Sequence, residues 1–127
     1  MTKVVLDASA LLALINQEEG WEIVEKYLPG SIMSSINLAE VVTVLMRLGI
    51  PLNKIKSLLS GIMKEIIPFD ESQAYIAAEW YTKSKSLGLS LGDRACLALA
   101  SSQKIPVITA DRVWGKIDKE IEVILLR

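Results

Sequence analysis

The stretch Ser-Leu-Gly-Asp-Arg-Ala-Cys-Leu-Ala-Leu-Ala, residues 90–100, has the pattern of a helix that begins at the edge of the core and continues into it. Ser90 is suited to the N-cap, and Asp93 stands where a carboxylate can bond back to the cap. Every residue from Ala95 to Ala100 is apolar, which is typical of a helix buried on nearly all sides. We therefore expect Asp93 at the border of the core, where ionised acids are uncommon without a partner. On this stretch alone, a capping role that complements the helix dipole is the simpler explanation.

The composition is that of one domain with a large core. The chain has 127 residues, which suits a single domain over residues 1–127. Apolar residues make up 51% and the mean hydropathy is +0.38, so the core is unusually complete or a partner covers apolar surface. The formal net charge of -1 excludes a global basic field that would attract nucleic acid. Any nucleic-acid contact must come from local clusters of basic residues.

The chain has no histidine, which excludes Ser-His-Asp and Cys-His catalysis and histidine-ligated zinc. An enzyme with this sequence must use carboxylates, hydroxyls, lysines or a bound metal. Cys96 is the single cysteine, so there is no internal disulfide and a reducing compartment is suitable. The apolar stretch 4–15 is interrupted by Asp7 and is too short to span a bilayer. We therefore expect a cytoplasmic protein that is not bound to a membrane.

Short apolar segments alternate with helical patterns along the whole chain. The predicted strands cover residues 3–6, 31–34, 65–69, 106–109 and 121–126. This order predicts an α/β fold with three layers, α/β/α, around a mostly parallel sheet of about five strands. In the helix predicted over 71–87, we expect Tyr81 to pack against the core and Trp80 to face solvent.

Acidic residues occur where this fold brings elements together. Asp7 follows the first strand and Asp111 follows the fourth, so both belong to the edge at which the strands end. Glu40 and Asp93 lie near the starts of helices that can open onto that edge. The alternative for Asp7 is that it caps the next helix, and both roles are compatible because a carboxylate has two oxygens.

Converging carboxylates need a compensating charge. A like-charge pair about 4 Å apart costs on the order of 4 kcal/mol at an effective dielectric constant near 20. Such a cluster is tolerable if some acids are protonated or if a cation lies among them. Oxygen ligands without His or Cys suit Mg²⁺ or Mn²⁺, and such an ion can bind phosphate oxygens and activate water. The chemistry that follows most naturally is phosphodiester hydrolysis.

The motifs at these positions resemble those of the PIN domain, and most closely the VapC-like ribonuclease toxins of type II toxin–antitoxin pairs. They are Val-Leu-Asp-Ala-Ser-Ala-Leu (5–11), Asn-Leu-Ala-Glu (37–40), Gly-Leu-Ser-Leu-Gly-Asp-Arg-Ala (88–95) and Thr-Ala-Asp (109–111). The resemblance implies that the family's metal-binding acids fall on Asp7, Glu40, Asp93 and Asp111. Its supporting polar positions would be Ser9, Asn37 and Thr109. Trp114 stands where the family often has Phe and should have the same packing role.

The resemblance implies a metal-dependent endoribonuclease that hydrolyses RNA. Mg²⁺ or Mn²⁺ would bind Asp7 and Asp93, with Glu40 and Asp111 completing the site directly or through water. Three basic residues follow the acids in sequence and are candidates for contacting the RNA backbone: Arg94, Arg112 and Lys116. Equally, they are surface charges that partly neutralise the acids.

The resemblance also implies protein partners. VapC-like toxins form homodimers and are inhibited by a cognate antitoxin that lays an apolar segment along toxin helices. The helix expected from Pro51 to Met63 would form one wall of the groove for that segment. The apolar composition is consistent with a surface of this kind.

Two other functions fit part of the pattern. In a receiver-type phosphoacceptor module, Asp70 would be the phosphorylated acid and Thr109 would follow the fourth strand. That module requires two adjacent acids after the first strand and a lysine after the fifth, and this chain has neither. The second alternative is a PIN-fold protein that binds partners without catalysis.

Overall fold

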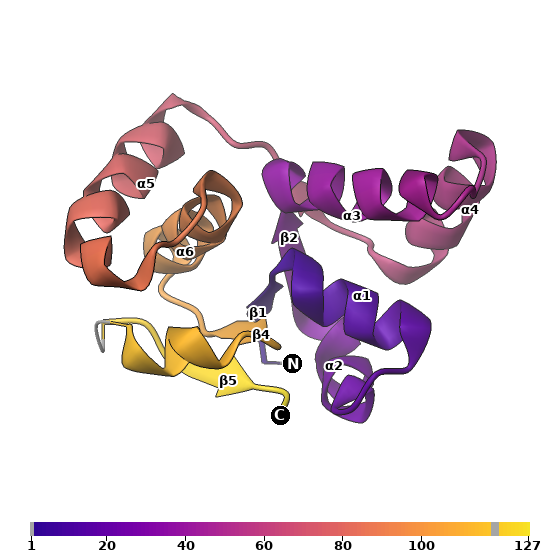
Figure 1. The fold of residues 1–127 in the computed structure, drawn as a ribbon, viewed down its shortest axis with the longest axis horizontal. Helices are drawn as coiled ribbons and strands as arrows, with labels where there is room; N and C mark the ends of the chain where they lie inside the picture. Colours follow the sequence, from indigo (N-terminus) through magenta and orange to yellow (C-terminus); the bar gives the residue numbers. More distant parts are fainter. Residues whose placement is uncertain (1, 118–119) are drawn as a thin grey trace.

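The computed structural model describes residues 2–117 and 120–127, and these residues form an α/β fold around a five-stranded sheet (Figure 1). All strand pairs are parallel, in the order β3-β2-β1-β4-β5. The strands are short and mostly buried: β1 (Val4–Leu6), β2 (Ser31–Ser34), β3 (Ile66–Ile67), β4 (Val107–Thr109) and β5 (Val123–Leu125). The prediction of a mostly parallel sheet of about five strands is confirmed.

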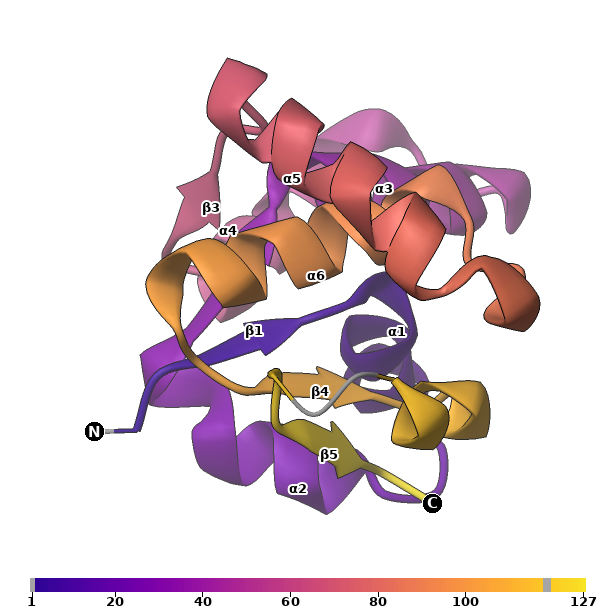
Figure 2. The same ribbon diagram turned by 90° about the vertical axis from the view of Figure 1, so that its left-hand side faces the viewer.

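Helices cover both faces of the sheet (Figure 2). The α-helices are α1 (Ala8–Asn16), α2 (Trp21–Tyr27), α3 (Ser35–Arg47), α4 (Leu52–Ile62), α5 (Glu71–Lys83) and α6 (Leu91–Gln103). Three 3-10 helices accompany them: η1 (Leu28–Gly30), η2 (Lys85–Leu87) and η3 (Arg112–Lys116). Among the described residues, no helix combines the length and apolar character needed to cross a membrane.

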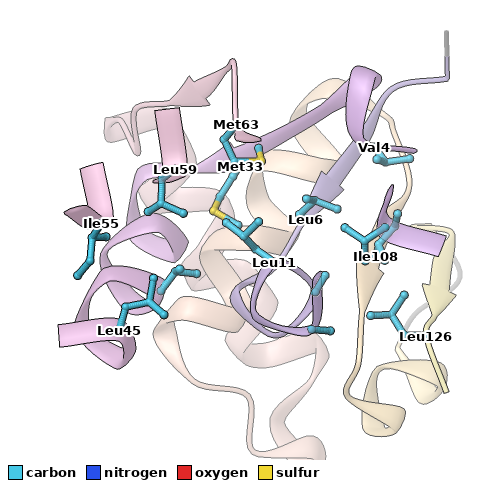
Figure 3. Packing of buried hydrophobic residues seen from close by; sticks show 14 residues of the cluster. Val4, Leu6, Leu11, Met33, Leu45, Ile55, Leu59, Met63, Ile108 and Leu126 are labelled. Carbon is cyan, nitrogen blue, oxygen red and sulfur yellow. The ribbon is translucent and has the colours of Figure 1, made fainter. Parts of the chain in front are cut away.

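Alternate residues of β1 supply two separate cores. Val4 and Leu6 face the core that α1, α2, α3 and α4 cover (Figure 3). Val5 faces the opposite core, which contains the apolar side of α6 together with Trp80 and Trp114. This alternation follows from the period of two residues in a strand. The helices therefore form the two outer layers of the predicted three-layer arrangement.

The helix predicted over 71–87 differs from the structure in length and orientation. α5 ends at Lys83 and η2 follows it. Trp80 is 0% exposed and Tyr81 is 54% exposed, so the expectation for these two side chains was wrong. The buried stripe consists of Gln73, Ala77 and Trp80, which have the spacing of one helical face. Apolar residues occur on both sides of this helix, so their pattern did not identify the buried side.

The strand order creates a switch point between β1 and β4. From β1 the chain extends the sheet through β2 to β3, and it then returns to add β4 and β5 on the other side of β1. In open parallel sheets, ligands bind at the carboxyl ends of the strands where the order reverses. Receiver-type modules have the order β2-β1-β3-β4-β5, so this topology excludes the receiver alternative.

Candidate active site

Asp7 lies at the switch point, directly after β1, and caps α1. Its Oδ1 accepts hydrogen bonds from the Ala10 amide at 2.9 Å and from the Ser9 hydroxyl at 2.7 Å. Its Oδ2 accepts a hydrogen bond from the Thr109 hydroxyl at 2.6 Å. The capping role and the position at the sheet edge therefore occur together.

The carboxyl group of Asp7 is 5% exposed and has no basic partner. The ion pairs within the described part of the chain join Lys3 to Glu65, Lys83 to Glu120 and Arg127 to Glu18, and none involves the four candidate acids. Burial raises the pKa of Asp7 from 3.8 to about 6, although the three hydrogen bonds lower it, and the charge of Asp93 raises it further. A positive charge at this position would offset the unfavourable burial.

Two hydroxyl groups hold the Asp7 carboxylate in one orientation. Ser9 and Thr109 each donate their single proton to it, one to each oxygen. The Ser9 oxygen accepts from the Ala110 amide at 2.9 Å, and the Thr109 oxygen accepts from the Asp111 amide at 3.0 Å. Because their donors and acceptors are used in this way, the hydroxyls join the ends of β1 and β4.

Glu40 reaches the site from α3 with the help of Asn37. The Asn37 side-chain nitrogen donates to Glu40 Oε1 at 2.8 Å and to the Gly92 carbonyl at 3.0 Å. Asn37 is 1% exposed, and its Oδ1 has no hydrogen-bond partner within the described residues. The amide thus connects the first turns of α3 and α6.

Asp93 forms the capping box that its spacing with Ser90 predicts. The Ser90 hydroxyl accepts from the Asp93 amide at 3.2 Å, and Asp93 Oδ2 accepts from the Ser90 amide at 2.9 Å. The cap is one role of this side chain, and its electrostatic effect on Asp7 shows that it also faces the site.

Asp111 lies at the periphery. It is exposed and caps η3, where its Oδ1 accepts from the Val113 amide at 3.0 Å. Its link to the other acids is the hydrogen bond from its amide to Thr109. Trp114 in η3 is fully buried, which confirms its predicted packing role.

Three of the acids act on the same buried thiol. Burial raises the pKa of Cys96 well above its ordinary value, and the charges of Asp7, Asp93 and Glu40 raise it further. The structure therefore brings these three acids to one region beside α6, with Asp111 outside it. Within residues 2–117 and 120–127, no three acidic, His or Cys side chains are already arranged to hold a metal ion together.

The donor set nevertheless suits a hard divalent cation. It consists of carboxylate oxygens from β1, α3 and α6, near the partnerless amide oxygen of Asn37. Asp7 is buried without a compensating charge, as a ligand of an absent cation would be. Asp93 and Asp111 instead spend one oxygen each on capping their own helices.

The predicted basic residues have contacts of their own. Arg94 Nη1 donates to the Ala77 carbonyl of α5 at 3.1 Å, and its guanidinium lies 5.7 Å from the centre of the Tyr81 ring. Arg112 Nε donates to the Arg127 carbonyl at 3.2 Å. Lys116 is exposed. A role of these residues in RNA binding stays a prediction.

Gly92 is the residue at the site that the sequence pattern did not identify. A Cβ at this position would overlap the carboxylate of Glu40. The available signal was a glycine in the first turn of an otherwise apolar helix, a position where glycine disfavours helix formation.

Comparison with known proteins gives the family. A model of the PIN domain matches residues 4–120. No curated protein matches the chain in sequence. Among solved structures, a toxin–antitoxin complex from Klebsiella pneumoniae is similar with a TM-score of 0.78 and 19% identity, over 98% of this chain and 98% of that chain.

Two further structures have the same fold. DNA-bound VapBC from Salmonella typhimurium gives a TM-score of 0.76 with 19% identity over 100% of both chains. VapC20 of Mycobacterium tuberculosis, a sarcin–ricin-loop-cleaving toxin, gives 0.72 with 16% identity, over 94% of this chain and 99% of that chain. The family model spans nearly the whole chain and includes all four candidate acids, so this chain belongs to the PIN-domain family.

Proposed function

We propose that this chain is a metal-dependent endoribonuclease and the toxin of a type II toxin–antitoxin pair. The observation that carries the proposal is the buried Asp7 carboxylate, which lies at the switch point of the sheet, close to Asp93 and Glu40 and without a basic partner. Membership of the PIN family supports it. Similarity in fold to VapC20, which cleaves the sarcin–ricin loop, supports RNA as the substrate.

Asp7 and Asp93 would hold Mg²⁺ or Mn²⁺, with Glu40 and Asp111 completing the site directly or through water. When bound, the ion would neutralise the acids, bind phosphate oxygens of RNA and lower the pKa of water. Ser9 and Thr109 keep the Asp7 carboxylate in a fixed orientation, so little reorganisation is needed when the ion binds.

Hydrolysis joins a water oxygen to phosphorus while the bond to the departing ribose oxygen breaks. The attacking water must lose a proton, and a carboxylate of the cluster can accept it. Glu40 is suited to this step because its Oε1 is fixed by Asn37. Arg112 and Lys116, exposed beside Asp111, are candidates for contacting RNA phosphates.

An apolar groove between α3 and α4 is the proposed site for the antitoxin. It is a hollow of about 410 Å³, and its lining includes Leu38, Val42, Leu52, Ile55, Leu59 and Met63. An amphipathic segment can place its apolar face in such a groove. Structures described as toxin–antitoxin complexes are among the similar folds. We further propose one domain over residues 1–127, a homodimer and a cytoplasmic location.

Cleavage of total cellular RNA by the purified chain tests the proposal, with new 5′ ends mapped by sequencing. Reactions contain Mg²⁺, Mn²⁺ or EDTA, and a parallel series uses Asp7→Asn. Defined new ends that require metal and disappear in Asp7→Asn are the expected result. Equal end patterns for the two proteins would contradict the proposal and favour a PIN-fold protein that binds partners without catalysis.

A further inference from the structure

Gly92 occupies a position that the backbone does not explain. It is the second residue of α6, and glycine is among the poorest helix formers. The glycines with positive φ among the described residues are Gly20, Gly49 and Gly88, so Gly92 does not need the left-handed region. Another requirement must favour glycine here.

That requirement is space for the Glu40 side chain. A Cβ on Gly92 would overlap Cδ and both carboxylate oxygens of Glu40, which places the carboxylate directly against the Gly92 backbone. Gly61 in α4 gives the contrast, because a Cβ there meets nothing within 4 Å. α3 and α6 pack side by side, so this contact joins two helices (Figure 1).

Asn37 holds the same carboxylate from its own helix. Its side-chain nitrogen bonds both Glu40 Oε1 and the Gly92 carbonyl, so one amide fixes the acid and the backbone on which it lies. Asn37 is buried, and its Oδ1 has no hydrogen-bond partner in the described part of the chain. This partnerless oxygen faces a ligand-sized need beyond the hydrogen bonds within the protein.

We propose that Gly92 and Asn37 are positioning residues that seat the Glu40 carboxylate for the reaction. The importance of the seat for cleavage rests on the proposed function, whereas the seat itself rests on the contacts above. The atoms that a Cβ would displace are the end of a flexible side chain. Gly92→Ala therefore moves the carboxylate of Glu40 out of position while α6 keeps its fold.

A double-mutant cycle of thermal unfolding in EDTA tests the seat without metal or RNA. The variants are Gly92→Ala, Glu40→Ala and the double variant. With Glu40 truncated, Gly92→Ala improves helix propensity and should raise Tm by about 3 °C. With Glu40 present, Gly92→Ala should leave Tm unchanged or lower it, because the carboxylate loses its place and its bond to Asn37.

Gly61→Ala is the matched control. It is a glycine in a helix with free space around it, so it should change Tm by the same amount with Glu40 or Ala at position 40. An equal effect of Gly92→Ala in both backgrounds would overturn the seat.

Two further readouts connect the seat to the reaction. Gly92→Ala should weaken Mn²⁺ binding in isothermal titration and reduce RNA cleavage at least tenfold, whereas Gly61→Ala should do neither. Glu40→Asp, which shortens the acid, should recover part of the activity in the Gly92→Ala background. Wild-type cleavage by Gly92→Ala would overturn the positioning role. If the wild-type chain cleaves no RNA, the proposed function fails, and the thermal cycle alone decides the seat.

Discussion

At the scale of single residues, Asp7 is stabilised in its protonated form by the protein without metal. Its pKa of about 6 in the folded chain exceeds the ordinary value of 3.8, and burial is the main cause. Between these two pH values the unfolded chain releases the proton first. The free energy of unfolding therefore falls as the pH rises from about 4 to above 6, by about 3 kcal/mol.

We predict that Asp7→Asn removes this pH dependence. In EDTA at pH 7.5 the variant should have a free energy of unfolding about 2–3 kcal/mol higher than the wild type, and near pH 4 the two should agree. Urea unfolding at both pH values measures the difference. A variant that is less stable than the wild type at pH 7.5 would show that the ionised carboxylate is already compensated.

The parts of the site that depend on local sequence could be predicted, and those that depend on distant contacts could not. The caps of Asp7 and Asp93 involve bonds to residues within three positions, so their spacing was sufficient. The bond between Asn37 and Gly92 joins residues 55 positions apart, and no local pattern indicates it. The exposed position of Asp111 depends in the same way on how η3 packs around Trp114.

At the scale of elements, the contact between α5 and α6 depends partly on Arg94. Its guanidinium bonds the Ala77 carbonyl and lies over the Tyr81 ring, so the side chain that sequence suggested for RNA also joins two helices. The orientation of α5 could not be predicted, because Trp80 and Tyr81 are adjacent aromatic residues and the packing of α6 decides which is buried.

We predict that Arg94→Ala lowers the free energy of unfolding by about 2 kcal/mol, through loss of a charged hydrogen bond and a cation–π contact. Arg112→Ala should be nearly neutral for stability, since Arg112 is exposed, and should raise KM for RNA. Urea unfolding and cleavage kinetics of both variants measure these effects. A raised KM with unchanged stability in Arg94→Ala would assign Arg94 to RNA binding instead.

At the scale of the whole molecule, the candidate site and the apolar groove belong to different parts of the fold. The acids lie at the switch point between β1 and β4, whereas the groove lies between α3 and α4. Alternation of strands and helices predicted the parallel sheet, because each element carried its own period. The strand order was not predictable from these periods, since it depends on where the chain returns after β3.

We predict that a charge in the groove separates inhibition from catalysis. Leu52 lines the groove and is 46% exposed, so Leu52→Asp should cost little stability. It should weaken inhibition by the antitoxin encoded beside this chain at least tenfold and leave cleavage unchanged. Tyr75→Asp, an equally drastic change at an exposed position of α5, is the control. Full inhibition of Leu52→Asp would place the antitoxin elsewhere.

The most direct test of the account compares two helix-capping acids. Asp93 caps α6 beside the site, and Asp70 caps α5 through its bond to the Gln73 amide at 2.9 Å. The measurement is RNA cleavage in Mn²⁺ and in EDTA by the wild type, Asp93→Asn and Asp70→Asn. Asn preserves capping in both variants. We predict metal-dependent cleavage that Asp70→Asn keeps and Asp93→Asn loses, with both variants folded. Equal cleavage by the two variants would contradict the assignment of a metal-dependent nuclease site to these acids.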